Sequence, residues 1–172
     1  MKILKYLLGG LAALAILFIL IGVFQPEIHY TTTISVNKSA AEAFAVFRDE
    51  NKTKDWLINW VSSEPVKGTP NEVGSQHKIT MNYQGNPFEM LETIKIYQPG
   101  EQYAMHLDSD MLAMDIDIRF QPEGTNKTVI TAENTIKGKG MIMRSIMALS
   151  KSATAEEDQQ NYDRLKQLIE EG

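Results

Sequence analysis

The chain of 172 residues contains one long apolar stretch, which runs from Tyr6 to Phe24 without a charged residue. At about 1.5 Å per residue, a helix over this stretch reaches about 28 Å, close to the roughly 30 Å hydrocarbon core of a bilayer. A helix packed inside a globular core rarely stays apolar on every side over such a length. The stretch therefore predicts a transmembrane helix over residues 6–24, preceded by a short segment over residues 1–5.

The residues around this stretch predict its orientation. Lys2 and Lys5 precede it and Glu27 follows it, so the positive-inside rule places the N-terminus in the cytoplasm. The rest of the chain would then face outward, into a periplasmic or extracellular space. A cleaved signal peptide is the alternative, but it needs small residues at a cleavage site, and Val23 and Phe24 are bulky. We therefore favour an uncleaved, single-pass membrane anchor.

The remaining residues, 28–172, have the length of one ordinary domain. The net charge of −5 argues against nucleic acid as a partner, because nucleic-acid binding needs a basic stripe. The absence of cysteine excludes disulfides, thiolate metal sites and cysteine nucleophiles. No metal-ligand spacing, nucleophile elbow or phosphate-binding glycine loop is present, so the sequence predicts neither a metal nor a cofactor.

The order of predicted elements indicates an α+β fold. A β-branched strand over His29–Val36 precedes a capped helix from about Ser39 and a second short helix or turn around Trp56 and Trp60. A meander of antiparallel strands follows, with glycine and proline at its turns. The last segment, Met141 to Glu171, predicts one long helix with a polar middle.

Such a sheet must bury one face, and the C-terminal helix is the largest element available to cover it. We therefore predict a curved antiparallel sheet of about six to seven strands wrapped around a long C-terminal helix, with room for a cavity between them.

Three sequence pieces carry a family resemblance: "ISVNKSAAEAFAVFRDENKTKDW" (Ile34–Trp56), "KGTPNEVGSQH" (Lys67–His77) and "RLKQLIE" (Arg164–Glu170). Their order and spacing resemble the helix-grip SRPBCC superfamily, which includes START-type lipid-transfer domains, the birch-pollen-allergen type and polyketide cyclase/dehydrase-like proteins. The resemblance extends from about Ile28 to Glu170. It implies the helix-grip fold and a cavity for an apolar or amphipathic ligand. It does not imply one reaction, because the fold hosts carriers, cyclases and chaperone regulators.

Strand alternation predicts which side chains face the interior. The predicted inward residues of the meander are His77, Ile79, Met81, Tyr83, Phe88, Met90, Glu92, Ile94, Ile96, Tyr103, Met105, Leu107, Leu112, Met114, Ile116, Ile118 and Phe120. Four of them are methionines, whose flexible side chains suit an adaptable pocket but also fill an irregular core.

His77 and Glu92 are polar residues on this apolar face. A buried carboxylate needs a partner or a shifted pKa. The two residues could reach solvent near strand ends, pair with each other, hold the polar head of a ligand, or act as general acid and base. We assign no catalytic residue and keep His77 and Glu92 as candidates. The predicted ligand cavity consists of His77, Met81, Tyr83, Met90, Glu92, Met105 and Met114.

Two other groups have less specific interpretations. Asp108, Asp110, Asp115 and Asp117 cluster around one predicted hairpin, but no calcium-type loop with a glycine and a closing glutamate accompanies them. They therefore predict a solvated face of the sheet. Trp56 and Trp60 either pin the short helix to the sheet or gate the mouth of the cavity.

Three functional hypotheses follow. The first is membrane-anchored binding of a lipid-like or other hydrophobic small molecule, because a tether raises the local concentration of a membrane-derived ligand. The second is a cyclase- or dehydratase-type enzyme that uses His77 and Glu92. The third is an interaction module that acts through its surface and has no cavity of the roughly 300 Å³ that ligand sites usually need.

Overall fold

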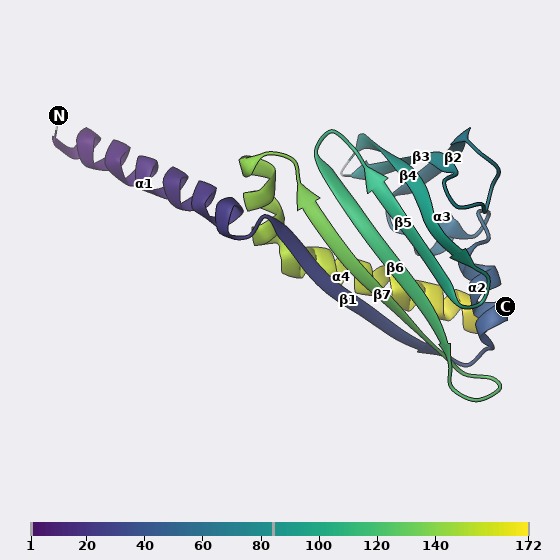
Figure 1. Ribbon diagram of the computed structural model, residues 1–172. Helices are drawn as coiled ribbons and strands as arrows, with labels where there is room; N and C mark the ends of the chain where they lie inside the picture. The colour runs from purple at the N-terminus through teal and green to yellow at the C-terminus, as the bar shows by residue number, and fades with distance from the viewer. Residues whose placement is uncertain (1, 84, 172) are drawn as a thin grey trace.

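The computed structural model describes residues 2–83 and 85–171 (Figure 1). Its helices are α1 (Lys2–Phe24), α2 (Ala40–Phe47), α3 (Thr53–Trp56) and α4 (Met141–Glu171). Its strands are β1 (Glu27–Val36), β2 (Trp60–Lys67), β3 (Gln76–Tyr83), β4 (Asn86–Gln98), β5 (Gln102–Asp108), β6 (Leu112–Pro122) and β7 (Thr128–Gly138). They form one seven-stranded antiparallel sheet in the order β1-β7-β6-β5-β4-β3-β2, which confirms the predicted fold class.

The C-terminal helix α4 runs along one face of the curved sheet, and α2 and α3 lie near its C-terminal end (Figure 1). Its buried residues Tyr162, Leu165 and Ile169 recur every three or four positions and so form one stripe. This stripe belongs to the same core as Ile34 of β1 and Ile130 of β7. Within the sheet, α4 packs mainly on β1 and β7. Burial of each apolar side chain in this stripe contributes about 1.5–3 kcal/mol to the stability of that packing.

Aromatic packing closes the end of the sheet beside α2. Helix α2 begins with a capping box, in which Ser39 and Glu42 each satisfy a backbone N–H of the other. The helix buries Phe44 and Phe47, and the Phe47 ring lies 5.8 Å from that of Trp56. The Trp56 ring also lies 6.1 Å from that of Tyr162 on α4. Trp56 therefore pins the short helix α3 to the core, which was one of the two interpretations of this residue.

Two details of the sheet differ from the sequence-based expectation. Trp60 does not lie in a short helix but begins β2, an edge strand that was not predicted. The strand contains Pro65, two register irregularities and mostly exposed side chains, so it lacks the alternation that marks a half-buried strand. In addition, a β-bulge between Ile94 and Ile96 reverses the faces of β4. Tyr97 rather than Ile96 therefore faces inward.

Helix α1 projects from the domain at the end where α4 begins (Figure 1). The most apolar 18 residues of Ile3–Phe24 have a mean hydropathy of 2.8, and 6% of these residues are buried. The helix is therefore long and apolar enough to cross a membrane, although a signal sequence has the same properties. It starts at Lys2 rather than Tyr6 and ends before Pro26, as expected from the proline.

A polar cluster joins α4 to the sheet beside this apolar core, with Thr32 and Asn134 buried and Asp158 half-buried. The Asp158 carboxylate on α4 accepts hydrogen bonds from the Thr32 hydroxyl of β1 and the Asn134 amide of β7. Burial raises the pKa of Asp158 above its usual value, and the two hydrogen bonds offset part of that effect. Burial also raises the pKa of Tyr162, and the nearby Asp158 charge adds to the rise.

The α4 stripe predicts the cost of a cavity. Leu165→Ala should lower the free energy of unfolding by about 2–5 kcal/mol, because it leaves a void in a fully buried site. Gln167→Ala, two residues away on the exposed side, should change it little. Urea titration of the full chain in mild detergent, followed by tryptophan fluorescence, measures both. Equal stabilities of the two variants would contradict the packing described here.

Asp158 predicts a pH dependence. The pKa of Asp158 is higher in the folded state than in the unfolded state, so the charged carboxylate lowers the stability above the folded-state pKa. This loss of stability disappears as the pH falls through the folded-state pKa to the pKa of the unfolded chain. The wild type should therefore gain stability relative to Asp158→Asn as the pH is lowered through this range. Asp110→Asn, at an exposed position, is the control and should follow the wild type. Parallel pH profiles for wild type and Asp158→Asn would show that the carboxyl is not desolvated.

Candidate functional site

The four predicted methionines lie on the inner face of β3 to β6. We call this group, Met81, Met90, Met105 and Met114, the methionine face. Met90 is buried with Ile79 and Leu107, and the other three methionines are half-buried around them. Trp60, Phe88, Leu112 and Ile116 are also half-buried beside this cluster. Because α4 packs mainly on β1 and β7, these apolar side chains are less fully covered than those of the main core.

The structure places one member of the predicted cavity elsewhere. Tyr83 is 56% exposed, because it is the last residue of β3 and lies at the tip of a hairpin, beyond the covered part of the sheet. Tyr83 was predicted to face the interior, but its side chain is exposed. The remaining predicted residues lie at the inner side of the sheet.

His77 and Glu92 are directly opposite each other on β3 and β4. Both are buried, with exposed fractions of 6% and 8%, so neither reaches solvent at a strand end. His77 Nδ1 lies 3.5 Å from Glu92 Oε2. Among the described residues, however, this nitrogen has no hydrogen-bond partner with acceptable geometry. The pair is therefore close but incompletely satisfied.

Tyr103 completes this site from the next strand, β5. Its hydroxyl donates a 2.7 Å hydrogen bond to Glu92 Oε1. Burial raises the pKa of the Tyr103 phenol, and the nearby Glu92 carboxylate raises it further. Tyr103 therefore stays protonated and serves as a hydrogen-bond donor, not as a base. Alternation predicted that Tyr103 faces inward, but not that its long side chain reaches Glu92, which lies eleven positions earlier in the chain.

Arg48, which follows α2, extends the site beyond the tyrosine. Its guanidinium carbon lies 4.4 Å from the centroid of the Tyr103 ring, within the range of a cation–π contact. Its Nη2 donates to Asn71 Oδ1 at 2.9 Å, while its Nε is buried without a partner among the described residues. Sequence reasoning missed Arg48. The signal available was a lone cation directly after the apolar run "FAVF".

These four side chains form a continuous series of contacts, from Arg48 through Tyr103 and Glu92 to His77. A buried polar atom without a partner costs about 1–3 kcal/mol and is a usual place for a bound water or ligand group. The two such atoms lie at the two ends of the series. The arrangement can therefore orient a hydroxyl or carbonyl group beside His77, and it places a carboxylate and an imidazole within reach of one proton.

Two hollows in the described part of the surface lie outside this series. One, of about 420 Å³, lies between the segment after α3 and the middle of α4, and is lined by Ile58, Asn59, Ala153, Glu156, Glu157 and Gln160. The other, of about 290 Å³, is on the outer face of β1 and β7, and is lined by His29, Tyr30, Thr31, Glu133, Asn134 and Thr135. Neither is lined by a residue of the predicted cavity.

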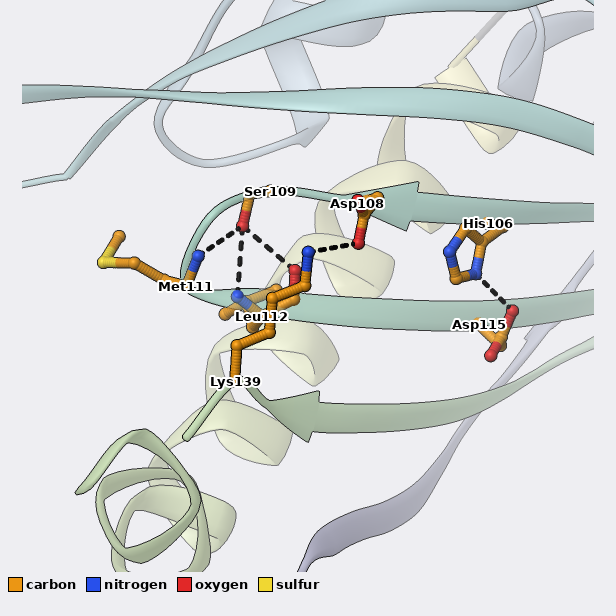
Figure 2. A network of polar contacts seen from close by, with 7 residues as sticks. All are labelled: His106, Asp108, Ser109, Met111, Leu112, Asp115 and Lys139. Atoms are coloured by element: carbon orange, nitrogen blue, oxygen red, sulfur yellow. Dashed lines mark hydrogen bonds and ion pairs between the residues drawn. The ribbon is translucent and has the colours of Figure 1, made fainter. Parts of the chain in front are cut away.

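Asp108 and Asp115 of the β5–β6 hairpin lie on the outer side of the sheet, as Figure 2 shows. His106 and Asp115 pair at 2.7 Å, Lys139 and Asp108 pair at 2.8 Å, and Ser109 caps the turn. Asp115 is 69% exposed at its side chain, as a solvated face requires. Within residues 2–83 and 85–171, no three histidine or acidic side chains are arranged to hold a metal ion.

Comparison with known proteins was informative only at the level of structure. No family model matches the sequence, and no curated protein matches it. The di-domain ARO/CYC StfQ from the steffimycin biosynthetic pathway is similar with a TM-score of 0.69 and 12% identity, over 86% of this chain and 52% of StfQ. TTHA0849 from Thermus thermophilus is similar with a TM-score of 0.67 and 13% identity, over 83% and 97% of the two chains.

The aromatase/cyclase Zhui from Streptomyces sp. R1128 gives a TM-score of 0.62 and 9% identity, over 83% of this chain and 96% of Zhui. The chain has the helix-grip fold. At these identities the similarity establishes the fold alone, so the function of this helix-grip domain must be argued from its own side chains.

The Tyr103–Glu92 hydrogen bond predicts a stability effect. Tyr103→Phe leaves a buried carboxylate without its donor and should lower the free energy of unfolding by about 1–3 kcal/mol. Tyr83→Phe removes a hydroxyl from an exposed ring and should have little effect. Chemical denaturation of the two variants makes the comparison. If both variants are as stable as the wild type, the buried bond contributes nothing.

Proposed function

We propose that this protein is a single-pass membrane protein whose outward-facing helix-grip domain binds a lipid-like or other amphipathic small molecule. The apolar part of the ligand would lie against the methionine face, and its polar group would lie at His77. Helix α1 would hold the domain at the membrane from which the ligand comes, with the N-terminus in the cytoplasm.

The proposal rests on the observation that His77 Nδ1 is buried without a hydrogen-bond partner among the described residues. This nitrogen belongs to β3, the strand that also contributes Ile79 and Met81, and it lies beside the Glu92 carboxylate. A hydroxyl or carbonyl on a bound molecule would relieve this unsatisfied atom. The methionine face supports the same proposal, because flexible thioether side chains adapt to apolar groups of different shapes.

A second candidate function is catalysis by His77 and Glu92. Two observations favour it: the two side chains are adjacent, and Tyr103 holds one oxygen of Glu92 in place. StfQ and Zhui, which share the fold, are described as an ARO/CYC and an aromatase/cyclase. Binding remains the first proposal, because it needs only a polar contact at His77 and apolar contacts with the methionine face, whereas catalysis also needs a proton transfer between His77, Glu92 and a substrate.

Photo-crosslinking tests the binding proposal with the full chain in lipid nanodiscs. The probe is a monoacylglycerol with a photoreactive diazirine in its acyl chain, which has a neutral head with hydroxyl groups. We expect crosslinks on the inner side of β3–β6, mapped by peptide mass spectrometry, in addition to those on α1. His77→Ala should reduce the β3–β6 crosslinks severalfold, while His106→Ala, on the outer face, should not.

The outcomes separate the hypotheses. Crosslinks confined to α1 would contradict ligand binding by the domain and favour a surface interaction module. The mass of the probe recovered without irradiation distinguishes binding from catalysis. An unchanged mass supports binding, whereas a converted probe that disappears in Glu92→Gln would favour an enzyme.

A further inference from the structure

The first three turns of α4 expose apolar side chains to solvent. Ile142, Ile146 and Leu149 are 65%, 41% and 63% exposed, and Met141 beside them is 53% exposed. Residues 142, 146 and 149 are spaced by four and three, so they share one face of the helix. Neighbouring exposed hydrophobic residues of this size are typical of an interaction surface. We call Met141, Ile142, Ile146 and Leu149 the α4 apolar face.

The same turns of α4 are joined to the apolar helix α1. The Ser145 hydroxyl accepts a 3.1 Å hydrogen bond from the Gly22 N–H and lies 2.6 Å from the Phe18 carbonyl, to which it donates. A Cβ at Gly22 would lie 2.5 Å from Ser145 Oγ and 2.6 Å from the Met141 carbonyl. Only glycine allows this approach of the two helices, so the contact is specific to position 22.

This contact fixes the depth of α4 relative to α1. Phe18 is six residues before Phe24, which is about 9 Å along a helix. If Ile3–Phe24 spans the bilayer, Phe24 marks the end of the span on the domain's side. Ser145 contacts Phe18 and Gly22, so it lies deeper in the bilayer than Phe24. The α4 apolar face then lies at the level of the lipid and not above it.

Charge around the α4 apolar face fits a membrane surface. The segment from Lys137 to Lys151 contains four cationic residues and no acidic residue, in a chain of net charge −5. One of the four, Lys139, pairs with Asp108 of the β5–β6 hairpin, and the other three are Lys137, Arg144 and Lys151. An interfacial helix typically combines an exposed apolar face with such cations, which attract anionic lipid headgroups. Met111, 45% exposed at the tip of the β5–β6 hairpin, is held beside this segment by the Lys139 N–H, which donates to the Met111 carbonyl.

We infer that the α4 apolar face inserts into the outer leaflet of the membrane beside α1 and forms a second membrane contact. The inference rests on the proposed function, because it needs α1 to span the bilayer. Ala153, Glu156 and Gln160, which line the larger hollow, continue the same helix face beyond Leu149. The second contact therefore places that hollow immediately above the lipid surface.

Site-directed fluorescence tests this inference, since the natural chain has no cysteine. Single variants of the full chain, Ile142→Cys and Leu149→Cys, are labelled with an environment-sensitive dye in vesicles of phosphatidylcholine and phosphatidylglycerol. Lipids with a spin label on the acyl chain quench a dye that lies in the bilayer. Leu14→Cys reports the span itself, and Glu133→Cys, exposed on the outer face of the sheet, reports the aqueous phase.

We expect lipid quenching at residues 142 and 149 to be severalfold stronger than at residue 133. Quenching at residue 14 with water-like signals at 142 and 149 would overturn the inference and leave the anchor intact. A water-like signal at residue 14 would instead contradict the anchor, and with it the proposed function. Energy transfer between labels on different chains, without lipid quenching, would indicate a second copy as the partner and would also overturn the inference.

The glycine contact provides a matched pair of variants. Gly22→Leu should separate α4 from α1 and reduce the quenching at residue 149 severalfold, without changing that at residue 14. Gly9→Leu places the same side chain in open space on the same helix and should change neither signal. Unchanged quenching at residue 149 in Gly22→Leu would overturn the role of this contact in setting the depth of α4.

Discussion

Burial of one stripe of α4 against β1 and β7 positions the other surfaces of this protein. Tyr162, Leu165 and Ile169 hold the last half of the helix on the sheet. Because the helix is continuous from Met141 to Glu171, the same packing directs its first turns to α1. It also leaves the inner side of β3–β6 only partly covered. The proposed ligand site and the proposed membrane contact are thus two consequences of where one helix lies.

The polar site is costly for the fold, which is an argument that it has a use. Glu92 is satisfied on one side by Tyr103, whereas His77 Nδ1 and Arg48 Nε are buried without partners among the described residues. Apolar side chains in place of His77 and Glu92 would avoid the desolvation of both groups. A site for an amphipathic molecule needs unpaired polar atoms next to apolar side chains before the molecule binds, and His77 Nδ1 and Arg48 Nε are such atoms.

Sequence patterns predicted the elements that have a strong period. The apolar helix, the meander and the long C-terminal helix were identified from hydrophobic runs and alternation, and the inward positions of the four methionines followed from the same alternation. The pairing of His77 with Glu92 could be expected only as one of several possibilities, because register is not visible in a single strand. The structure shows that they are opposite each other.

The sequence patterns failed where local backbone geometry, or a contact between residues far apart in the chain, determines the position of a side chain. The edge strand β2 has little burial and so no alternation, and the bulge in β4 exchanges the faces of Ile96 and Tyr97. Tyr83 was predicted to be buried because alternation shows which side of a strand a residue occupies. It does not show how far along the strand other elements cover that side, and Tyr83 is exposed. Arg48 and the Gly22–Ser145 contact join residues far apart in the chain, for which no local pattern exists.

The central claim is that the methionine face takes up an amphipathic molecule from the membrane. Methyl-labelled methionine NMR of the full chain in nanodiscs tests it most directly, with Met81, Met90, Met105 and Met114 assigned by substitution. Addition of monoolein to the nanodiscs should shift these four methyl signals and produce cross-relaxation between the monoolein acyl chain and Met105. Four signals that stay unchanged at saturating monoolein, while lipid contacts appear only on Met141 of the α4 apolar face, would contradict the account.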